Sequence, residues 1–165
     1  MTIDGRYGGS GRYLRFESSE RNYPILHLHD DCQDVSLLYC EFRSDNSNTW
    51  TDRGGAVLVD RVQTQGHDRL RVEGCHVTDL SFAQSGSGLD LVYGLKVVSP
   101  DGGGERMEGL QLINNEFYDI RRAGFYNREQ NGVLDSVYAQ GNSFYATGTH
   151  PGSDVDYVGY WGLYL

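Results

Sequence analysis

The chain has little of what marks several large functional classes. It has 3 cysteines in 165 residues, and none of them has the CxxC spacing of a metal site. Its formal net charge is −9, and it has no basic stripe, which disfavours nucleic acid because phosphate contacts need clustered Lys and Arg. The same charge disfavours an anionic membrane surface. The chain also lacks a signal peptide and an apolar run long enough to cross a membrane.

Helical periodicity is missing as well. No stretch places apolar residues at i, i+3, i+4 and i+7 over three turns. The 22 glycines are spread along the chain, and β-branched and aromatic residues fill the runs between them. These features predict an all-β protein that consists of short strands and many turns.

One short pattern occurs four times, at residues 34–42, 68–77, 108–117 and 135–144. Each copy has an acidic residue, an alternating strand, a tight polar turn, a Cys or Asn, one variable residue, and then Phe or Val. The Cys or Asn falls at positions 40, 75, 115 and 142, which gives intervals of 35, 40 and 27 residues. A repeat of this length with short strands indicates a solenoid.

A second apolar strand lies upstream of each copy, at 25–29, 56–59, 94–98 and 124–127, and a fifth at 160–165 ends the chain without its second half. Each unit is therefore strand, turn, strand, turn and a short third segment. Such units bury their apolar faces only when they stack, at about 4.8 Å per rung. We expect a single domain over residues 1–165, a parallel β-helix of about five rungs. Polar excursions at 45–55, 81–88 and 100–105 would leave it as loops.

The repeat predicts two internal columns. The first contains Cys40, Cys75, Asn115 and Asn142, in which stacked Asn side chains bond to each other. The second contains Phe42, Val77, Phe117 and Phe144. Stacked free thiols at Cys40 and Cys75 are favoured over a disulfide, because stacking alone does not give disulfide geometry. For Cys32, which lies in a turn, both a free thiol and a bridge remain open.

The opening segments resemble a known arrangement. They read TIDGRYGGSGRYLRF at 2–16, PILHLH at 24–29 and VSLLYC at 35–40, and resemble the right-handed parallel β-helix (pectin-lyase-like) segments of large secreted bacterial surface proteins. The turns NNEF at 114–117 and GNSF at 141–144 are similar to the N-x-F rungs of polysaccharide lyases and epimerases of that superfamily. The resemblance covers residues 2 to about 147 and implies a right-handed β-helix outside the cell. It does not imply an activity, because the superfamily includes lyases, hydrolases, epimerases, phage tailspikes and adhesin stalks.

A lyase of this fold needs a base for the sugar C5 proton and a cation that neutralises the uronate. The order of Lys96 and Arg128, with an N-x-F turn between them, resembles the alginate and chondroitin lyase family, some of which use Ca²⁺. Of the acidic Ca²⁺ ligands of that family, only Asp90 is present here. Lys96 also lies about two residues away from the position of the catalytic base in that family. The alternative is that both side chains are solvated or contact a glycan.

Other residues fit sugar binding or a metal. Trp50 lies in a polar loop, and Tyr126 lies near a turn. Arg121 and Arg122 lie in a turn beside Lys96 and Arg128, and could form an anion-binding corner or an ordinary turn. Flat aromatic faces beside polar groups suit sugar rings, although Trp50 could equally fold its loop onto the body. Tyr7, Tyr13 and Tyr157 also lie near turns.

The run His27-x-His29-Asp30-Asp31 could hold a metal. The favoured interpretation is that both histidines lie on the outer face of a strand before a polar turn. We expect no cofactor, except Ca²⁺ if the protein is a lyase.

These observations predict a non-catalytic, extracellular or cell-surface segment that recognises carbohydrate, in an adhesin- or tailspike-like role. The alternative is a polysaccharide lyase that cleaves a uronate-containing glycan by β-elimination. Because the chain begins inside a strand–turn pattern and stops within an apolar strand, we expect end-to-end stacking or flanking domains, with no nucleic acid partner and no membrane insertion.

Overall fold

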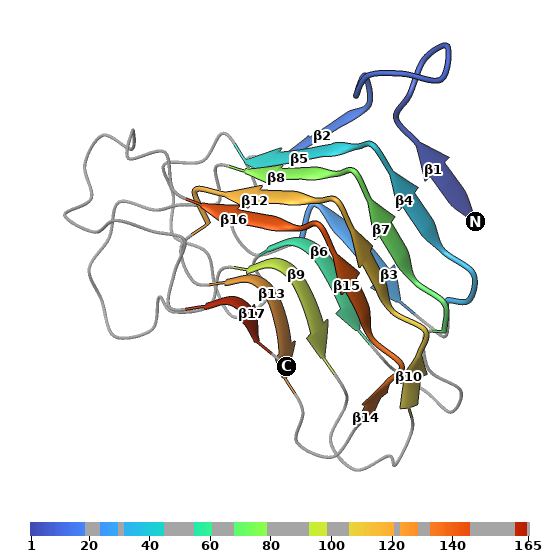
Figure 1. The fold of residues 1–165 in the computed structure, drawn as a ribbon, viewed down its shortest axis with the longest axis vertical. Coiled ribbons are helices and arrows are strands. Elements are labelled where there is room, and N and C mark those ends of the chain that lie inside the picture. Colours follow the sequence, from blue (N-terminus) through green and yellow to red (C-terminus); the bar gives the residue numbers. More distant parts are fainter. Residues whose placement is uncertain are drawn as a thin grey trace, which may run out of the picture.

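In a computed structural model the three main sheets stack their strands in parallel (Figure 1). The structure describes residues 1–18, 24–29, 32–44, 55–60, 68–78, 93–98, 106–120, 123–128, 133–145 and 161–164. Every regular element within these ranges is a strand. Nowhere in these ranges does a helix occur that has the length and apolar character to span a membrane.

Each of the three main sheets has five strands. Sheet A contains β1 (Thr2–Asp4), β4 (Ser36–Leu38), β7 (Arg71–Glu73), β11 (Gln111–Ile113) and β15 (Tyr138–Gln140). Sheet B contains β2 (Arg15–Ser18), β5 (Glu41–Ser44), β8 (His76–Thr78), β12 (Glu116–Tyr118) and β16 (Ser143–Tyr145). Sheet C contains β3 (Leu26–His29), β6 (Gly55–Asp60), β9 (Tyr93–Val98), β13 (Ala123–Arg128) and β17 (Trp161–Tyr164). A fourth sheet pairs β10 (Arg106–Glu108) with β14 (Val133–Asp135).

The chain visits sheets A, B and C in the same order five times, and we call each passage a circuit. Strands that are neighbours in a sheet come from successive circuits and pair in parallel throughout. The predicted all-β, parallel architecture is confirmed, and so is the grouping of the second apolar strands, which form sheet C.

The predicted aromatic column runs along the inner face of sheet B. Phe42 pairs with Val77, Val77 with Phe117, and Phe117 with Phe144. The rings of Phe117 and Phe144 stack with centroids 5.1 Å apart. Phe16 extends the column by one strand, because its ring stacks on Phe42 at 5.1 Å. Alternation within each strand therefore buries one apolar residue per circuit at this position.

The Cys and Asn residues form the second predicted column, at the turn from sheet A to sheet B. Asn115 Nδ2 donates a hydrogen bond to Asn142 Oδ1 at 2.9 Å and another to the carbonyl of Val72 at 2.9 Å. Asn115 Oδ1 accepts the backbone N–H of Cys75 at 2.9 Å. Asn142 Nδ2 donates to the carbonyl of Leu112 at 2.8 Å. Each side chain of the column thus binds the backbone of the preceding circuit.

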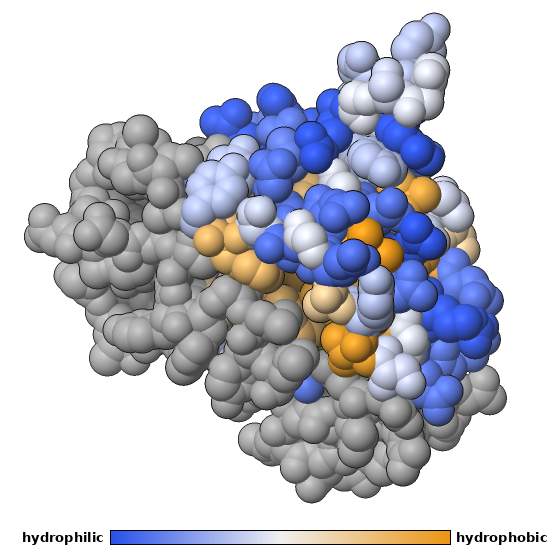
Figure 2. Space-filling model, viewed as in Figure 1, coloured by the Kyte–Doolittle hydropathy of each residue, from blue (hydrophilic) through white to orange (hydrophobic). Residues whose placement is uncertain are grey.

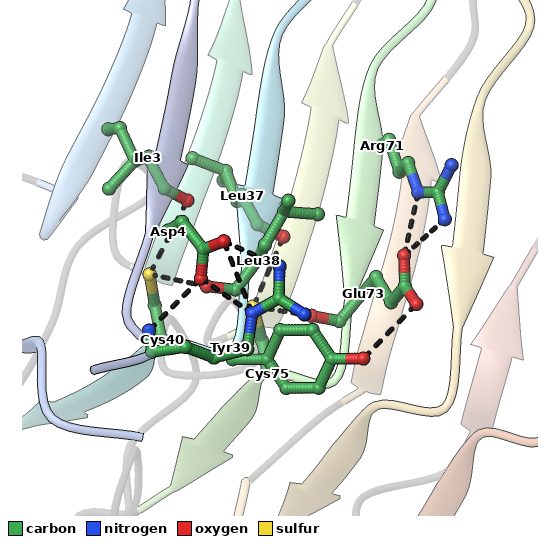
Figure 3. Close-up of polar contacts among 10 residues, drawn as sticks. Ile3, Asp4, Leu37, Leu38, Tyr39, Cys40, Arg71, Glu73 and Cys75 are labelled. Atoms are coloured by element: carbon green, nitrogen blue, oxygen red, sulfur yellow. Dashed lines mark hydrogen bonds and ion pairs between the residues drawn. The ribbon is translucent and has the colours of Figure 1, made fainter. Parts of the chain in front are cut away.

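The two cysteines make the same contact with sulfur. The Cys75 thiol donates to the carbonyl of Leu37 at 3.4 Å, and the Cys40 thiol faces the carbonyl of Ile3 at 3.9 Å (Figure 3). Both thiols are buried and outside any disulfide, and the partly buried Cys32, which also forms no disulfide, donates from its thiol to the carbonyl of His29 at 3.1 Å. A hydrogen bond with the Cys40 thiol, together with burial, raises the pKa of the Cys75 thiol. The prediction of stacked free thiols is confirmed.

The residue just before this column adopts a left-handed backbone in four circuits. The φ angles are 52° at Tyr39, 61° at Gly74, 53° at Asn114 and 66° at Gly141. Gly and Asn tolerate this region best. A Cβ at Gly74 would also lie 2.6 Å from the ring of Tyr39. The polar turn of the repeat is therefore a tight left-handed corner between sheets A and B.

Side chains outside this corner cross between circuits. The guanidinium of Arg6 lies 4.4 Å from the centre of the Tyr39 ring, and Tyr39 Oη donates to Glu73 Oε1 at 3.3 Å (Figure 3). Hydrogen bonds from Arg6 lower the pKa of Asp4 to about 2. The first circuits are thus tied together on the outside as well as through the core.

One feature of the predicted repeat is wrong by one residue. We expected Asp34 to align with the acidic residues at 68, 108 and 135. Instead Gln33 pairs with Asp68, and Asp34 takes a left-handed conformation with φ 53° in the next position. The carboxylate of Asp34 then binds Arg69, with Oδ2 2.8 Å from Nη2. This ion pair lowers the pKa of Asp34 and explains why an acid stands there.

Candidate functional site

The residues predicted for lyase chemistry lie on neighbouring strands of sheet C. Lys96 on β9 pairs with Tyr126 on β13, and Arg128 pairs with Val98. The two predicted residues are therefore on adjacent circuits, as expected, but two positions apart in register. Their catalytic role stays a prediction.

Lys96 is buried beside the Tyr93 ring. Its side chain is 4% exposed, and Nζ lies 5.2 Å from the centre of the Tyr93 ring. Tyr93 is fully buried and stacks on Tyr126 with centroids 4.2 Å apart. Tyr126 is partly exposed. The ammonium group is thus held against an aromatic face, and in this structure it is not presented to a polymeric substrate.

Several predicted site residues lie outside the described part of the chain. They are Trp50, Arg121 and Arg122, together with Tyr157, Asp30, Asp31 and Asp90. His27 and His29 are described, and both are exposed on β3 with their rings stacked 5.0 Å apart. The prediction that they share the outer face is confirmed. Across the described ranges no three His, Cys, Asp or Glu side chains come together as a metal site would require.

The outer face of sheet B carries a polar and aromatic cluster that the sequence analysis did not identify. By register Arg15, Glu41, His76, Glu116 and Ser143 follow one another across the five strands. Arg15 Nε donates a hydrogen bond to Glu41 Oε2 at 2.9 Å, so the first two residues of this row pair with each other. In Figure 2 hydrophilic residues cover most of the face over β4, β5, β7 and β8, whereas apolar residues show near β15 and β16.

Glu116 is the centre of the C-terminal part of the row. Its Oε2 accepts a hydrogen bond from Tyr145 Oη at 3.2 Å and lies 3.1 Å from His76 Nε2. Its Oε1 lies 4.0 Å from Arg12 Nη2. The Glu116 side chain is 37% exposed, so this carboxylate faces solvent as well as its three partners.

Two tyrosines stand beside this carboxylate. The rings of Tyr118 and Tyr145 stack with centroids 5.2 Å apart and planes 8° apart, and His76 meets Tyr118 edge to face at 6.2 Å. Burial and the nearby charge of Glu116 raise the pKa of Tyr145. We call Arg12, His76, Glu116, Tyr118 and Tyr145 the Tyr145 cluster. Because Phe117 and Phe144 point inward, strand alternation predicts that the residues next to them, such as Tyr118 and Tyr145, point outward.

The segment between β1 and β2 contributes Arg12 to this cluster. Arg12 Nε donates to the carbonyl of Gly74 at 2.6 Å, across 62 residues of sequence. Tyr7 and Tyr13 lie in the same segment and are 80% and 69% exposed. Their rings pack edge to face with centroids 6.2 Å apart. The segment thus fixes a cation over sheet B and leaves two aromatic rings in solvent.

Comparison of this chain with models of protein families, with curated proteins and with solved structures found no match. The resemblance to the pectin-lyase-like superfamily therefore rests on the sequence motifs and on the parallel sheets.

Proposed function

We propose that sheets A, B and C are the three faces of a right-handed parallel β-helix, and that each circuit is one rung. Five circuits in constant order support this interpretation, as do the two internal columns that cross them. Solenoids of this kind present long, regular outer faces on which side chains repeat at strand spacing.

The function that fits this surface best is that of an extracellular, structural segment that recognises carbohydrate without cleaving it. One observation carries the proposal, namely which aromatic residues are buried and which are exposed. The phenylalanines of sheet B stack inside, whereas the exposed aromatic side chains in the described part of the chain are tyrosines: Tyr7, Tyr13, Tyr138 and Tyr145. A tyrosine offers an apolar face and a polar hydroxyl, which suits the faces and edges of sugars.

A polysaccharide lyase that uses Lys96 and Arg128 is the competing function. The pairing of β9 with β13 favours it, because a base and a cation would come from adjacent strands. The 4% exposure of Lys96 weighs against it, since a base must reach the sugar C5 proton.

One experiment separates the two functions. The protein is incubated with a panel of acidic and neutral polysaccharides, and both retention on the polymer and new ultraviolet-absorbing unsaturated ends are measured. We expect retention without unsaturated ends. Unsaturated ends that vanish in Lys96→Ala or Arg128→Ala would establish the lyase instead. If neither retention nor cleavage is observed, the protein is a structural spacer.

A further inference from the structure

We propose that residues 5–13, which we call the β1–β2 hairpin, are a contact site for a neutral sugar. In this site the rings of Tyr7 and Tyr13 receive the C–H face of a pyranose. The inference rests on the proposed carbohydrate-binding function and adds a location and a class of sugar. Arg12 of the hairpin lies 4.0 Å from Glu116 on the outer face of sheet B, so one glycan chain can extend from that face onto the hairpin.

The backbone of the hairpin closes on itself and gives it a fixed shape. Tyr7 and Ser10 exchange two backbone hydrogen bonds, of 3.2 and 3.3 Å. Gly8 and Gly9 lie between them with φ angles of 60° and 81°, and a two-residue turn with positive φ at both positions is a favoured way to close a hairpin. Because this loop is ordered before a ligand arrives, little conformational entropy is lost on binding.

Two arginines hold the hairpin on the body of the protein. Arg6 Nε donates to the carboxylate of Asp4 at 2.9 Å, and its guanidinium lies over the ring of Tyr39. Arg12 Nε donates to the carbonyl of Gly74 at 2.6 Å. The residues between the two arginines carry no charged side chain. The hairpin is therefore anchored through its charged side chains and has a neutral tip.

The tip presents two aromatic rings to solvent. Tyr7 is 80% exposed and Tyr13 is 69% exposed. Their planes are 82° apart, so the rings form two walls of an open corner. The backbone of Gly11 supports the Tyr13 ring, and a Cβ at Gly11 would collide with that ring. The loop between β1 and β2 projects beyond the sheets in Figure 1, and in Figure 2 its surface is pale, which indicates intermediate hydropathy.

This corner offers the two kinds of contact that a pyranose makes. The face of an aromatic ring carries partial negative charge, and the C–H bonds on one face of a pyranose are weakly positive. Gly8, Gly9 and Ser10 are exposed beside the rings. Within the described ranges the N–H groups of Gly8 and Gly9 enter no backbone hydrogen bond. These N–H groups and the Ser10 hydroxyl can therefore donate to sugar hydroxyl groups.

The charge distribution selects the class of sugar. The guanidinium groups of Arg6 and Arg12 are engaged with the body of the protein, so the tip offers no cation to a uronate or a sulfate. The whole chain has a net charge of −9, which repels an acidic glycan. The ligand expected at the hairpin is therefore a neutral hexose or an N-acetylated one.

The test is isothermal titration of the intact protein with cellohexaose, laminarihexaose and N-acetylchitohexaose, and with hexagalacturonate as the acidic probe. We expect at least one neutral oligosaccharide to bind more tightly than hexagalacturonate. Tyr7→Ala should raise the Kd of that oligosaccharide about tenfold. Tyr7→Phe keeps the ring, so it should raise the Kd less. Because Tyr7 is 80% exposed, Tyr7→Ala should leave the melting temperature unchanged, which separates lost binding from lost folding.

Tyr138→Ala is the matched control. Tyr138 is 52% exposed on sheet A, with its hydroxyl bonded to Gln140, so its loss should leave binding unchanged. Equal binding by Tyr7→Ala and Tyr138→Ala would overturn the inference, as would tighter binding of hexagalacturonate.

The remaining outcomes separate this site from the proposed function. If a neutral oligosaccharide binds the unmodified protein and the double variant Tyr7→Ala/Tyr13→Ala equally well, the proposed function stands and the hairpin site falls. If no oligosaccharide binds the unmodified protein, both fall. If, in addition, sedimentation shows a dimer that Tyr7→Ala dissociates, the hairpin contacts a second copy of the chain instead.

Discussion

Replacing Asn115 by Leu tests the internal column directly. Asn115 is fully buried, and its side chain satisfies the N–H of Cys75 and the carbonyl of Val72. Leucine is similar in size but has no polar atom, so both backbone groups would lose their partner. A buried polar group without a partner costs about 1–3 kcal/mol, so the expected loss of unfolding free energy is about 2–6 kcal/mol. That is a large part of the total of about 5–15 kcal/mol that is typical of a folded domain.

The assay is urea unfolding followed by circular dichroism, with the midpoint and the slope compared between variants. The control is Gln111→Leu, which changes a half-buried amide on β11 that makes no side-chain hydrogen bond within the described residues. We expect that change to fall within about 0.5 kcal/mol. Asn115→Cys should lie between the two, because a thiol at this position in the preceding circuit still donates to a carbonyl. Equal midpoints for Asn115→Leu and Gln111→Leu would refute the column.

Three further changes test local features of the fold. Thr78→Val should leave the melting temperature unchanged or raise it, because Thr78 is 2% exposed and its hydroxyl has no hydrogen-bond partner among the described residues. A clear fall would mean that the hydroxyl is bonded. Gly74→Ala should lower the melting temperature, since φ is 61° and the new Cβ would lie 2.6 Å from the Tyr39 ring, and Tyr39→Ala should partly rescue it. Arg6 lowers the pKa of Asp4 from 3.8 to about 2 in the folded protein. The pair therefore contributes fully to stability at a pH above the unfolded-state pKa of Asp4, and this contribution is lost as the pH falls through the folded-state pKa. An NMR titration of the Asp4 carboxyl that gives an ordinary pKa would contradict the pair.

Much of the architecture could be predicted because it depends on spacing. The position three residues after each inward residue of sheet A falls at the corner, and only a small or hydrogen-bonding side chain fits there. That constraint is visible in the sequence as Cys40, Cys75, Asn115 and Asn142. Side-chain alternation then fixes Phe42, Phe117 and Phe144 on the inner face.

The error at Asp34 shows the limit of pattern matching. An acidic residue near the start of a repeat can align with the acidic residues of the other circuits or lie one position later in the turn. The ion pair with Arg69 decides between them, and it depends on contacts between circuits that a single repeat does not contain.

The candidate site was harder to predict for the same reason. Tyr118 and Tyr145 are 27 residues apart in sequence and adjacent only because β12 and β16 pair in register. Arg12 reaches the same place from a segment more than 100 residues away from Glu116. The residues singled out for lyase chemistry came from a resemblance in order along the chain, which does not report that Lys96 is buried.

The most direct test of carbohydrate recognition is an NMR chemical-shift map of the protein titrated with the neutral oligosaccharide that binds best. We expect the largest shifts at Ser143–Tyr145 and Glu116–Tyr118, on the outer face of sheet B. Shifts centred on Ala123–Arg128, or no shifts at saturating sugar, would contradict it.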